Sequence, residues 1–440
     1  MGQQFVPYEP DQALLFPPSL DDWLPKGHLA RFVSETVEQL DLERFYARFR
    51  AREDGRGRIA YEPRMLLKVL IYSYSQGIFS SRRIAAGMED LVALRYLAAG
   101  NQPSHRTIAR FRQEHIGDFH ELFVQVVRIA AEVGLVKLGT IAIDGTKLKA
   151  NASKHKSMSY GRMKQEEARI AKEVVELTKR AQAIDEAEDA EYGEDDRGDG
   201  LPEELQRREE RLARIRAAKE RLEREQATAD EAAGRGEYNA KTGRGRVKRP
   251  NGVPPDKKQS NFTDPESRIM GNPKRGFVQG YNGQIAVDEE AGIVVAARIT
   301  QSAADVHELA PMTEEVIENV GRSPKRVLAD SGYKSEAGFA RLEELGVEAH
   351  VALGKGEAEA SVSKGAGPAT RRMERRRRTK RSDALYRRRK VIAEPPFGWI
   401  KSALGFRAFG LRGVDKVRGE WNLVCLALNL KRLSPRMAWQ

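Results

Sequence analysis

Three acidic residues stand where the sequence could place them to hold a metal ion. Asp144 and Asp330 each follow a short run with the composition of a buried strand, and Glu394 precedes a helix-like segment near the C-terminus. Hard cations such as Mg²⁺ take oxygen ligands, so carboxylates that are distant in sequence and meet in the fold suit them. Two such ions about 4 Å apart activate a nucleophile and stabilise a leaving oxygen in phosphoryl transfer. The pattern therefore favours metal-dependent chemistry on phosphate esters.

Each acid also has an ordinary structural interpretation. The pair Asp144-Gly145 stands between alternating residues and is a strong hairpin-turn signal. Asp330, in the sequence ADSG, fits an Asx turn or a helix cap, and Glu394 fits a surface loop. For each acid alone these interpretations remain open. Their combination with the charge balance and the order of strands and helices favours a shared site.

Charge indicates the kind of partner. The chain has 440 residues, of which 32% are charged, and a formal net charge of +12. A sequence pI of about 9.6 favours a polyanion, most often nucleic acid, although a soluble protein with basic loops would look similar. No Gly-rich phosphate loop of the usual kinds is present, so an enzyme of small molecules has no support.

Cysteine content and the absence of apolar runs indicate the compartment. Cys425 is the only cysteine, which excludes a disulfide within the chain and argues against a cysteine-based zinc site. The N-terminus has no basic start followed by an apolar run, and no segment approaches about 18 continuous apolar residues. We expect a soluble, cytoplasmic protein with no membrane partner.

The N-terminal third is predicted to be helical. Residues 1–27 are rich in Pro and Asp and are expected to form an extended arm, and residues 28–136 show apolar residues at helical spacing. Such a set of short helices can hold a helix-turn-helix, or it can serve only to support the next domain. DNA contact is favoured by basic residues near helix starts, namely Arg82, Arg83, His105, Arg106, Arg110 and Arg112.

The pattern changes to strands at Gly139, and a catalytic domain is expected over 137–435. It is interrupted by an insertion, 157–262, in which heptad repeats predict an antiparallel helical hairpin over 161–230. The hairpin's mixed charges predict a solvated protrusion. The loop 233–260 and the arginine-rich run 371–390, within a basic segment 355–392, are expected to be disordered and to contact DNA. Without the insertion the order is strand, strand, strand, helix, strand, helix, strand, helix, which predicts a mixed α/β core.

Several motifs together resemble a known family. The segments IAIDGTKLKANAS, RVLADSGYKSEAGF and YRRRKVIAEPPFGWIK, with NFTDPESRIM and GYNGQIAVD, are similar to those of DDE transposases of bacterial insertion sequences, and the resemblance covers nearly the whole chain. It implies an all-helical N-terminal domain and a ribonuclease H-like mixed-sheet core, into which the hairpin predicted from the heptad repeats is inserted. It also implies that Asp144, Asp330 and Glu394 form a catalytic triad that binds Mg²⁺ or Mn²⁺, as two ions.

The family's glutamate segment carries a Tyr, an Arg and a Lys at fixed spacings. Tyr386 and Lys401 stand at the spacings that the family has. Glu394 lies one residue further from Arg389 than in the family's pattern, and at the family's spacing when it is counted from Lys390. Because a residue before proline disfavours the helical region, we expect Glu394 to sit at a helix start with the prolines in its first turn. The residues expected to contact DNA around the site are Lys147, Lys149, Lys154, Tyr386, Arg389, Lys390 and Lys401.

The resemblance implies a reaction and a partner. The expected activity is metal-dependent cleavage at inverted-repeat ends followed by strand transfer into target DNA, by a homodimer assembled on DNA and associated with a bacterial nucleoid. Two alternatives are an inactivated or domesticated transposase that only binds DNA, and a structure-selective nuclease without strand transfer.

Overall fold

Seven helices form the N-terminal region of the computed structural model, which describes residues 19–50, 60–192, 203–234, 250–272, 276–354 and 366–437. Ser104 caps the sixth helix by accepting from Thr107 N, and Pro63 opens the third, as their types predict. The third helix is buried on nearly all sides and is the centre of this region. The helices are α1 (Leu29–Gln39), α2 (Glu43–Arg50), α3 (Pro63–Ser75), α4 (Ser81–Asp90), α5 (Val92–Leu97), α6 (His105–Glu114) and α7 (Phe119–Glu132).

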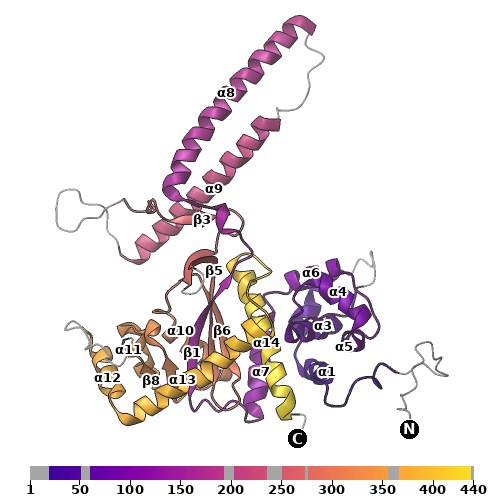
Figure 1. Ribbon diagram of the computed structural model, residues 1–440, viewed down its shortest axis with the longest axis vertical. Helices are drawn as coiled ribbons and strands as arrows, with labels where there is room; N and C mark the ends of the chain where they lie inside the picture. The colour runs from indigo at the N-terminus through magenta and orange to yellow at the C-terminus, as the bar shows by residue number, and fades with distance from the viewer. Residues whose placement is uncertain are drawn as a thin grey trace, which may run out of the picture.

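A mixed sheet of six strands follows (Figure 1). Along its main path the order is β4–β5–β1–β7–β8, and β6 also pairs with β5. The central strand β1 is antiparallel to β5 over its whole length and parallel to β7 on its other side. Strands β5 and β6 form an antiparallel hairpin around the sequence DEEAG. The strands are β1 (Ile141–Lys149), β4 (Arg268–Asn272), β5 (Gly276–Asp288), β6 (Val294–Thr300), β7 (Arg326–Ala329) and β8 (Glu348–Val351).

Helices cover both faces of this sheet. The face that carries the side chains of Asp144 and Thr146 lies under α13, its π-helical end η3 and α14, whereas the opposite face lies under α10. Helix α14 also packs against α7 and α3 and so joins the sheet to the N-terminal helices. The elements are α10 (Leu309–Val320), η2 (Ser331–Tyr333), α11 (Glu336–Glu344), α12 (Pro368–Arg377), α13 (Lys380–Gly398), η3 (Trp399–Ala403) and α14 (Val414–Met437).

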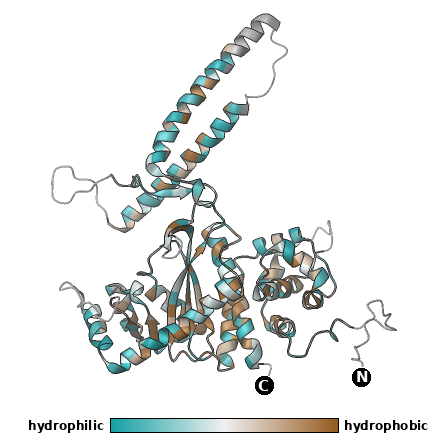
Figure 2. Cartoon of the chain, in the orientation of Figure 1, coloured by the Kyte–Doolittle hydropathy of each residue, from teal (hydrophilic) through white to brown (hydrophobic). Residues whose placement is uncertain are grey.

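Two long helices, α8 (Tyr160–Tyr192) and α9 (Glu203–Ala232), pack on each other and project from the sheet (Figure 1). The heptad residues Met163, Ile170, Leu212, Ile215 and Leu222 form their own small core. A short ladder of β2 (Ser157–Ser159) and β3 (Gln259–Asn261) joins this pair to the body, after the short helix η1 (Lys154–Lys156). Figure 2 shows hydrophobic residues gathered in the sheet and its covering helices, while α8 and α9 are largely hydrophilic.

The basic segment differs from the sequence expectation. The run 371–390, expected to be a disordered arm, lies almost entirely within α12 and α13, which pack on α11 and on the sheet. Within the expected arm, 1–27, residues 1–18 lie outside the described residues. Within the expected loop, 233–260, residues 235–249 lie outside them. Within the described part of the chain no helix combines the length and apolar character that crossing a membrane requires.

Candidate active site

Asp144 lies in the middle of β1, and the strand does not turn there. The ladder with β5 continues without interruption from Ile141 to Lys149, so the hairpin-turn interpretation of Asp144-Gly145 is wrong. Asp144 Oδ1 accepts from Gly145 N at 2.9 Å, and Oδ2 accepts from Arg389 Nη1 at 3.3 Å. The side chains of Asp144 and Arg389 are only 20% and 10% exposed. Asp144 is thus presented from a rigid strand and paired with an arginine of α13.

Asp330 follows the neighbouring strand β7. In the parallel pairing of β1 and β7, Ala142 lies opposite Leu328. Asp144 and Asp330 each follow one of these paired residues by two positions, so they stand at the same level along the two strands. Asp330 Oδ1 accepts from Gly332 N at 2.8 Å and caps η2, so the capping interpretation of this residue is correct. The other carboxylate oxygen is not used in this cap. A capping role and a site role are therefore compatible for Asp330.

The ionisation of Asp144 reflects its surroundings. Burial raises the pKa of Asp144 from its ordinary value of 3.8 to about 6, against the opposing effect of Arg389 and the Gly145 amide. The negative charges of Asp330 and Asp305 raise this pKa further. Asp144 is thus close enough to Asp330 and Asp305 for their charges to affect it, and neighbouring carboxylates of this kind favour binding of a cation.

Glu394 does not stand at a helix start. Helix α13 runs on through Pro395 and Pro396, so Glu394 lies inside it and is exposed. The expectation of a helix beginning at the prolines was wrong, because the packing of α13 across the sheet outweighs the loss of two backbone hydrogen bonds. Arg389, which faces Asp144, precedes Glu394 by five residues, or about 140° around the helix. Glu394 instead shares a face with Lys390 and Tyr386, at spacings of four residues.

The donor chemistry of the site suits a hard divalent cation, because Asp144 and Asp330 supply only oxygen atoms. Among the described residues, however, no three or more His, Cys, Asp and Glu side chains are grouped closely enough to hold a metal ion. The structure thus brings Asp144 and Asp330 onto neighbouring strands and leaves Glu394 on the adjoining helix. That the three share a metal stays a prediction.

Of the other residues predicted near the site, Lys401 and Tyr386 make specific contacts, and the remaining lysines lie on β1, η1 and α13. Lys401, which lies in η3, donates to Thr146 Oγ1. Thr146 is two residues beyond Asp144 on β1, so Lys401 reaches the strand beside Asp144. Tyr386 stacks under two guanidinium groups, Arg377 at 4.2 Å and Arg389 at 6.0 Å from its ring centre. Of the remaining lysines, Lys147 is half-buried on β1 and Lys149 is exposed at the end of that strand. Lys154 lies in η1, and Lys390 is exposed on α13.

The predicted basic residues of the N-terminal region are exposed on α4 and α6, apart from the half-buried His105 and the buried Arg112. Arg82, Arg83, Arg106 and Arg110 are exposed. Arg112 is buried and donates to Tyr74 Oη and Phe79 O at 2.9 and 2.8 Å, so its predicted DNA contact was wrong. Helical periodicity places Arg112 beside the buried Phe111 and Ile108, which was the signal for its burial.

Three polar residues at this site were not predicted. Asp305, Gln284 and Tyr333 form a hydrogen-bonded cluster behind β1, on the face opposite Arg389. Asp305 lies in an irregular segment, and Gln284 and Tyr333 occupy buried positions of β5 and η2. Only the polar Gln284 inside the apolar run QIAV signalled an unusual environment.

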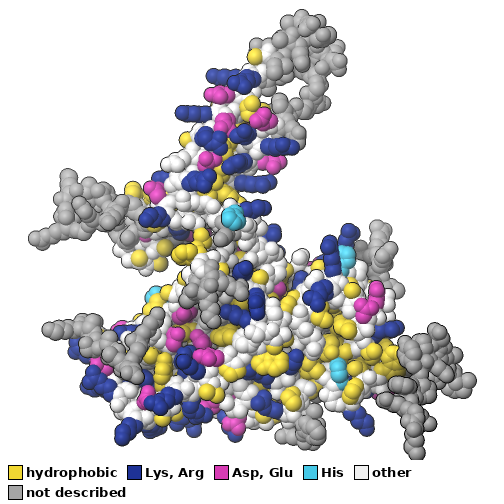
Figure 3. Space-filling model, in the orientation of Figure 1, with side chains coloured by type: hydrophobic (Ala, Val, Ile, Leu, Met, Phe, Trp, Pro, Cys, Tyr) yellow, Lys and Arg dark blue, Asp and Glu magenta, His cyan; other side chains and the backbone are white. Residues whose placement is uncertain are grey.

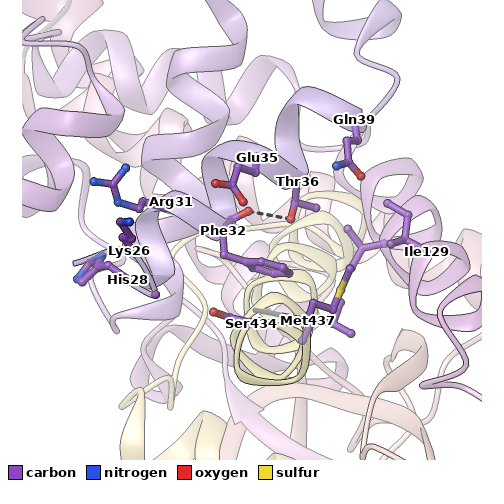
Figure 4. Close-up of a pocket in the computed structure, with 13 residues that line it drawn as sticks. Lys26, His28, Arg31, Phe32, Glu35, Thr36, Gln39, Ile129, Ser434 and Met437 are labelled. Carbon is purple, nitrogen blue, oxygen red and sulfur yellow. Dashed lines mark hydrogen bonds between the residues drawn. The ribbon is translucent and has the colours of Figure 1, made fainter. Parts of the chain in front are cut away.

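A separate pocket of about 360 Å³ lies between α1 and the ends of α7 and α14 (Figure 4). Lys26, His28 and Arg31 stand at one end, and Phe32, Ile129 and Met437 form an apolar part. None of the predicted site residues lines it. The pocket is therefore distinct from the carboxylates.

Two family models match parts of the chain. Residues 250–430 match a family described as "Transposase DDE domain", and residues 18–114 match one described as "Transposase domain (DUF772)". The chain belongs to the DDE transposases of insertion-sequence type. The first match contains Asp330 and Glu394 and begins after Asp144. No curated protein and no solved structure matched the chain.

Membership of the DDE transposases supports DNA as the substrate and implies transposase or nuclease activity in general. DDE transposase domains generally use divalent metal ions. The helical region matched by the second family contains Arg82, Arg83, Arg106 and Arg110. The individual roles of these residues and of the three acids are matters for the proposal below.

Proposed function

We propose that this DDE transposase cleaves DNA at the ends of its element and joins the freed ends to target DNA, with Asp144, Asp330 and Glu394 as its catalytic acids. The observation that carries the proposal is the pair of neighbouring carboxylates, Asp144 within β1 and Asp330 directly after the parallel strand β7, whose charge raises the pKa of Asp144. The strand order, with β6, β5 and β1 antiparallel and β7 and β8 parallel to β1, supports a ribonuclease H-like core.

The acids would hold Mg²⁺ or Mn²⁺, and the bound cations would make water or a DNA 3′-hydroxyl a better nucleophile and stabilise the leaving oxygen. This chain's own groups then have separate tasks. Arg389 fixes Asp144 from α13, and Lys401 is placed beside Thr146 to neutralise a phosphate. Tyr386, stacked on Arg389, limits the movement of that guanidinium.

Basic surfaces would hold the DNA on either side. Figure 3 shows Lys and Arg side chains across the part of the body that α12 occupies and along α8 and α9. We assign phosphate contacts to Lys147, Lys149, Lys154 and Lys390 near the acids and to the exposed arginines of α4 and α6. Joining two element ends calls for at least two copies of the chain, so we propose a homodimer assembled on DNA.

One observation favours a second candidate, a transposase-derived protein that binds DNA without cutting it. The three acids do not form one metal-sized group among the residues described. In that case the protein would retain end binding and have no metal-dependent activity. A nuclease that cuts without joining would cleave the same DNA and leave no transfer product.

The experiment compares Asp144→Asn and Asp330→Asn with the wild type on a labelled duplex that carries an element end, with Mg²⁺. We expect both variants to lose cleavage and strand transfer while binding the duplex as the wild type does. Glu290→Gln is the matched control, because Glu290 is an exposed acid paired with Lys137 at the other end of the sheet. Cleavage by Asp144→Asn would remove the proposed site, and a wild type that binds but never cuts would select the second candidate.

A further inference from the structure

The carboxylate of Asp305 lies at the centre of a polar cluster behind β1. Its Oδ1 accepts from Asn282 Nδ2 at 2.7 Å and from Gln284 Nε2 at 2.6 Å. Both amides belong to β5 and are buried, so water cannot replace the carboxylate as their acceptor. The carbonyl of Asp305 accepts from Glu308 N at 3.0 Å, at the start of α10. Asp305 is therefore held by its backbone and binds two side chains of the strand next to β1.

The same cluster reaches the turn that carries Asp330. The carboxamide of Gln284 donates to Asp305 at one end and accepts from the Tyr333 hydroxyl at the other. Tyr333 is fully buried and is the last residue of η2, the short helix that Asp330 caps. A carboxamide has a donor nitrogen at one end and an acceptor oxygen at the other. Because Asp305 accepts from the nitrogen of Gln284, it leaves the oxygen of Gln284 free to accept a hydrogen bond from the Tyr333 hydroxyl.

Two glycines leave space for this cluster. A methyl group at Gly145 would lie 2.9 Å from Asp305 Oδ1 and in closer conflict with Gln284 Nε2. One at Gly332 would lie 3.5 Å from Asp305 Oδ2 and 3.0 Å from Asp330 Oδ1. The glycine one residue after Asp144 and the glycine two residues after Asp330 therefore face the same carboxylate. The space beside Asp144 that Gly145 provides is filled by Gln284 and Asp305 on the far face of β1.

We propose that Asp305 is a positioning residue of the active site, which orients Gln284 and, through Gln284 and Tyr333, fixes the strand ends that present Asp144 and Asp330. The inference rests on the function proposed above, because Asp144 and Asp330 are the acids that it positions. Asp305 acts through hydrogen bonds accepted by Oδ1. It is not assigned to the metal, since that oxygen already receives two amide donors.

The test separates hydrogen bonding from charge with two variants of the full-length protein. Asp305→Ala removes the acceptor, whereas Asp305→Asn keeps an oxygen in the same place. With saturating end DNA, we expect the alanine variant to cleave about 10- to 100-fold more slowly with an unchanged Kd for DNA, because small misplacement of reacting groups has that effect. The asparagine variant should recover most of the rate, to within about threefold of the wild type.

A second readout does not depend on cleavage. Mn²⁺ binding to the DNA-free protein, measured by electron paramagnetic resonance, should weaken about tenfold in Asp305→Ala and remain near wild type in Asp305→Asn, since outer groups that orient metal ligands have effects of this size. If the wild type binds Mn²⁺ without cutting DNA, the proposed activity fails, and this comparison still decides the role of Asp305.

Asp288→Ala is the matched control. Asp288 is a buried aspartate at the other end of β5 and accepts from Leu138 N at 2.8 Å, so its loss should lower the melting temperature and leave the cleavage rate and Mn²⁺ affinity unchanged. Gly145→Ala, which pushes Gln284 away, should reproduce the effect of Asp305→Ala. The proposal is overturned if Asp305→Ala behaves as the wild type in both readouts. It is equally overturned if Asp305→Asn is as impaired as Asp305→Ala, because the charge would then be the essential property.

Discussion

At the scale of single residues, the environment of Asp144 opposes its own ionisation. Burial raises the pKa of this carboxyl to about 6, although Arg389 pairs with it. A carboxylate that is held partly desolvated beside other acids reduces the stability of the folded protein, and a bound cation would relieve this cost. Asp144 thus has the signature of a residue kept for function at the expense of stability.

This cost predicts how Asp144→Asn changes stability with pH. Since the folded pKa lies above the unfolded value of 3.8, the folded state binds the extra proton between about pH 4 and 6, and the wild type loses stability as pH rises through that window. In metal-free buffer at pH 8 we expect Asp144→Asn to unfold with a free energy about 1 to 3 kcal/mol larger than that of the wild type. Urea titrations at pH 8, 6 and 4 measure the difference, which should vanish near pH 4.

The exposed Glu290→Gln should show no such dependence. A variant Asp144→Asn that is less stable than the wild type at pH 8 would mean that the Arg389 pair outweighs burial, and that the site is not strained by its charge.

The sequence indicated Asp144 and Asp330 because each follows a short apolar run typical of a buried strand, and such runs are visible in composition. It could not locate Asp305. That residue joins the site only through the register of β5 on β1, which places Gln284 opposite Gly145. Register is a property of paired strands and leaves no local signal in the irregular segment around Asp305.

At the scale of elements, the basic run is helical for reasons that lie elsewhere in the chain. Glu336 accepts from the first amides of α12, and Glu343, also on α11, pairs with Arg372. Met373 is buried on α12, which packs against β8 and α11, and the buried Arg377 donates to Ser382 O of α13 at 2.9 Å. The sequence showed an excess of arginine over nearby acids and predicted disorder, because the neutralising acids of α11 are about 30 positions away.

In the part of the chain that the structure describes, some basic residues of α12 and α13 form ion pairs with acidic side chains, and others are exposed without one. The exposed side chains with no ion pair among the described residues include Arg375, Lys380, Arg381 and Lys390. Replacing these four with Gln should lower the slope of log K against log salt for duplex DNA by about 3 to 4, since each phosphate contact contributes about 0.9. Fluorescence anisotropy between low and moderate salt measures the slope.

The matched control neutralises four exposed basic residues on other elements, Lys26, Arg44, Lys137 and Arg418. An equal loss of slope in both quadruple variants would show a general effect of net charge, and the exposed face of α12 and α13 would then hold no DNA.

At the scale of the whole molecule, the N-terminal helices and the sheet share one interior. The Tyr74 hydroxyl of α3 accepts from Arg112 of α6 at 2.9 Å and donates to Glu420 of α14 at 3.3 Å. Glu420 Oε2 accepts from Gly410 N and Leu411 N at 2.9 and 3.1 Å. The same helix α14 approaches so closely that a methyl group at Gly419 would overlap the Ile116 carbonyl. Patterns along the chain predicted two separate regions and gave no sign of these long-range contacts.

We expect the buried polar chain to make the two regions one folding unit, and a double-mutant cycle tests this. Arg112→Met leaves Glu420 buried without its compensating charge and should cost about 3 to 5 kcal/mol. Glu420→Gln leaves Arg112 in the same situation, so the double variant should be more stable than the sum of the two losses predicts, by about 1 to 3 kcal/mol. Urea unfolding, followed by intrinsic tryptophan fluorescence and by far-ultraviolet circular dichroism, should give one coincident transition in the wild type. Arg110→Met, an exposed arginine on the same helix, should change the free energy by less than about 0.5 kcal/mol. Strictly additive losses, or an early transition of the helical region alone, would show that the N-terminal helices are stable independently of the sheet.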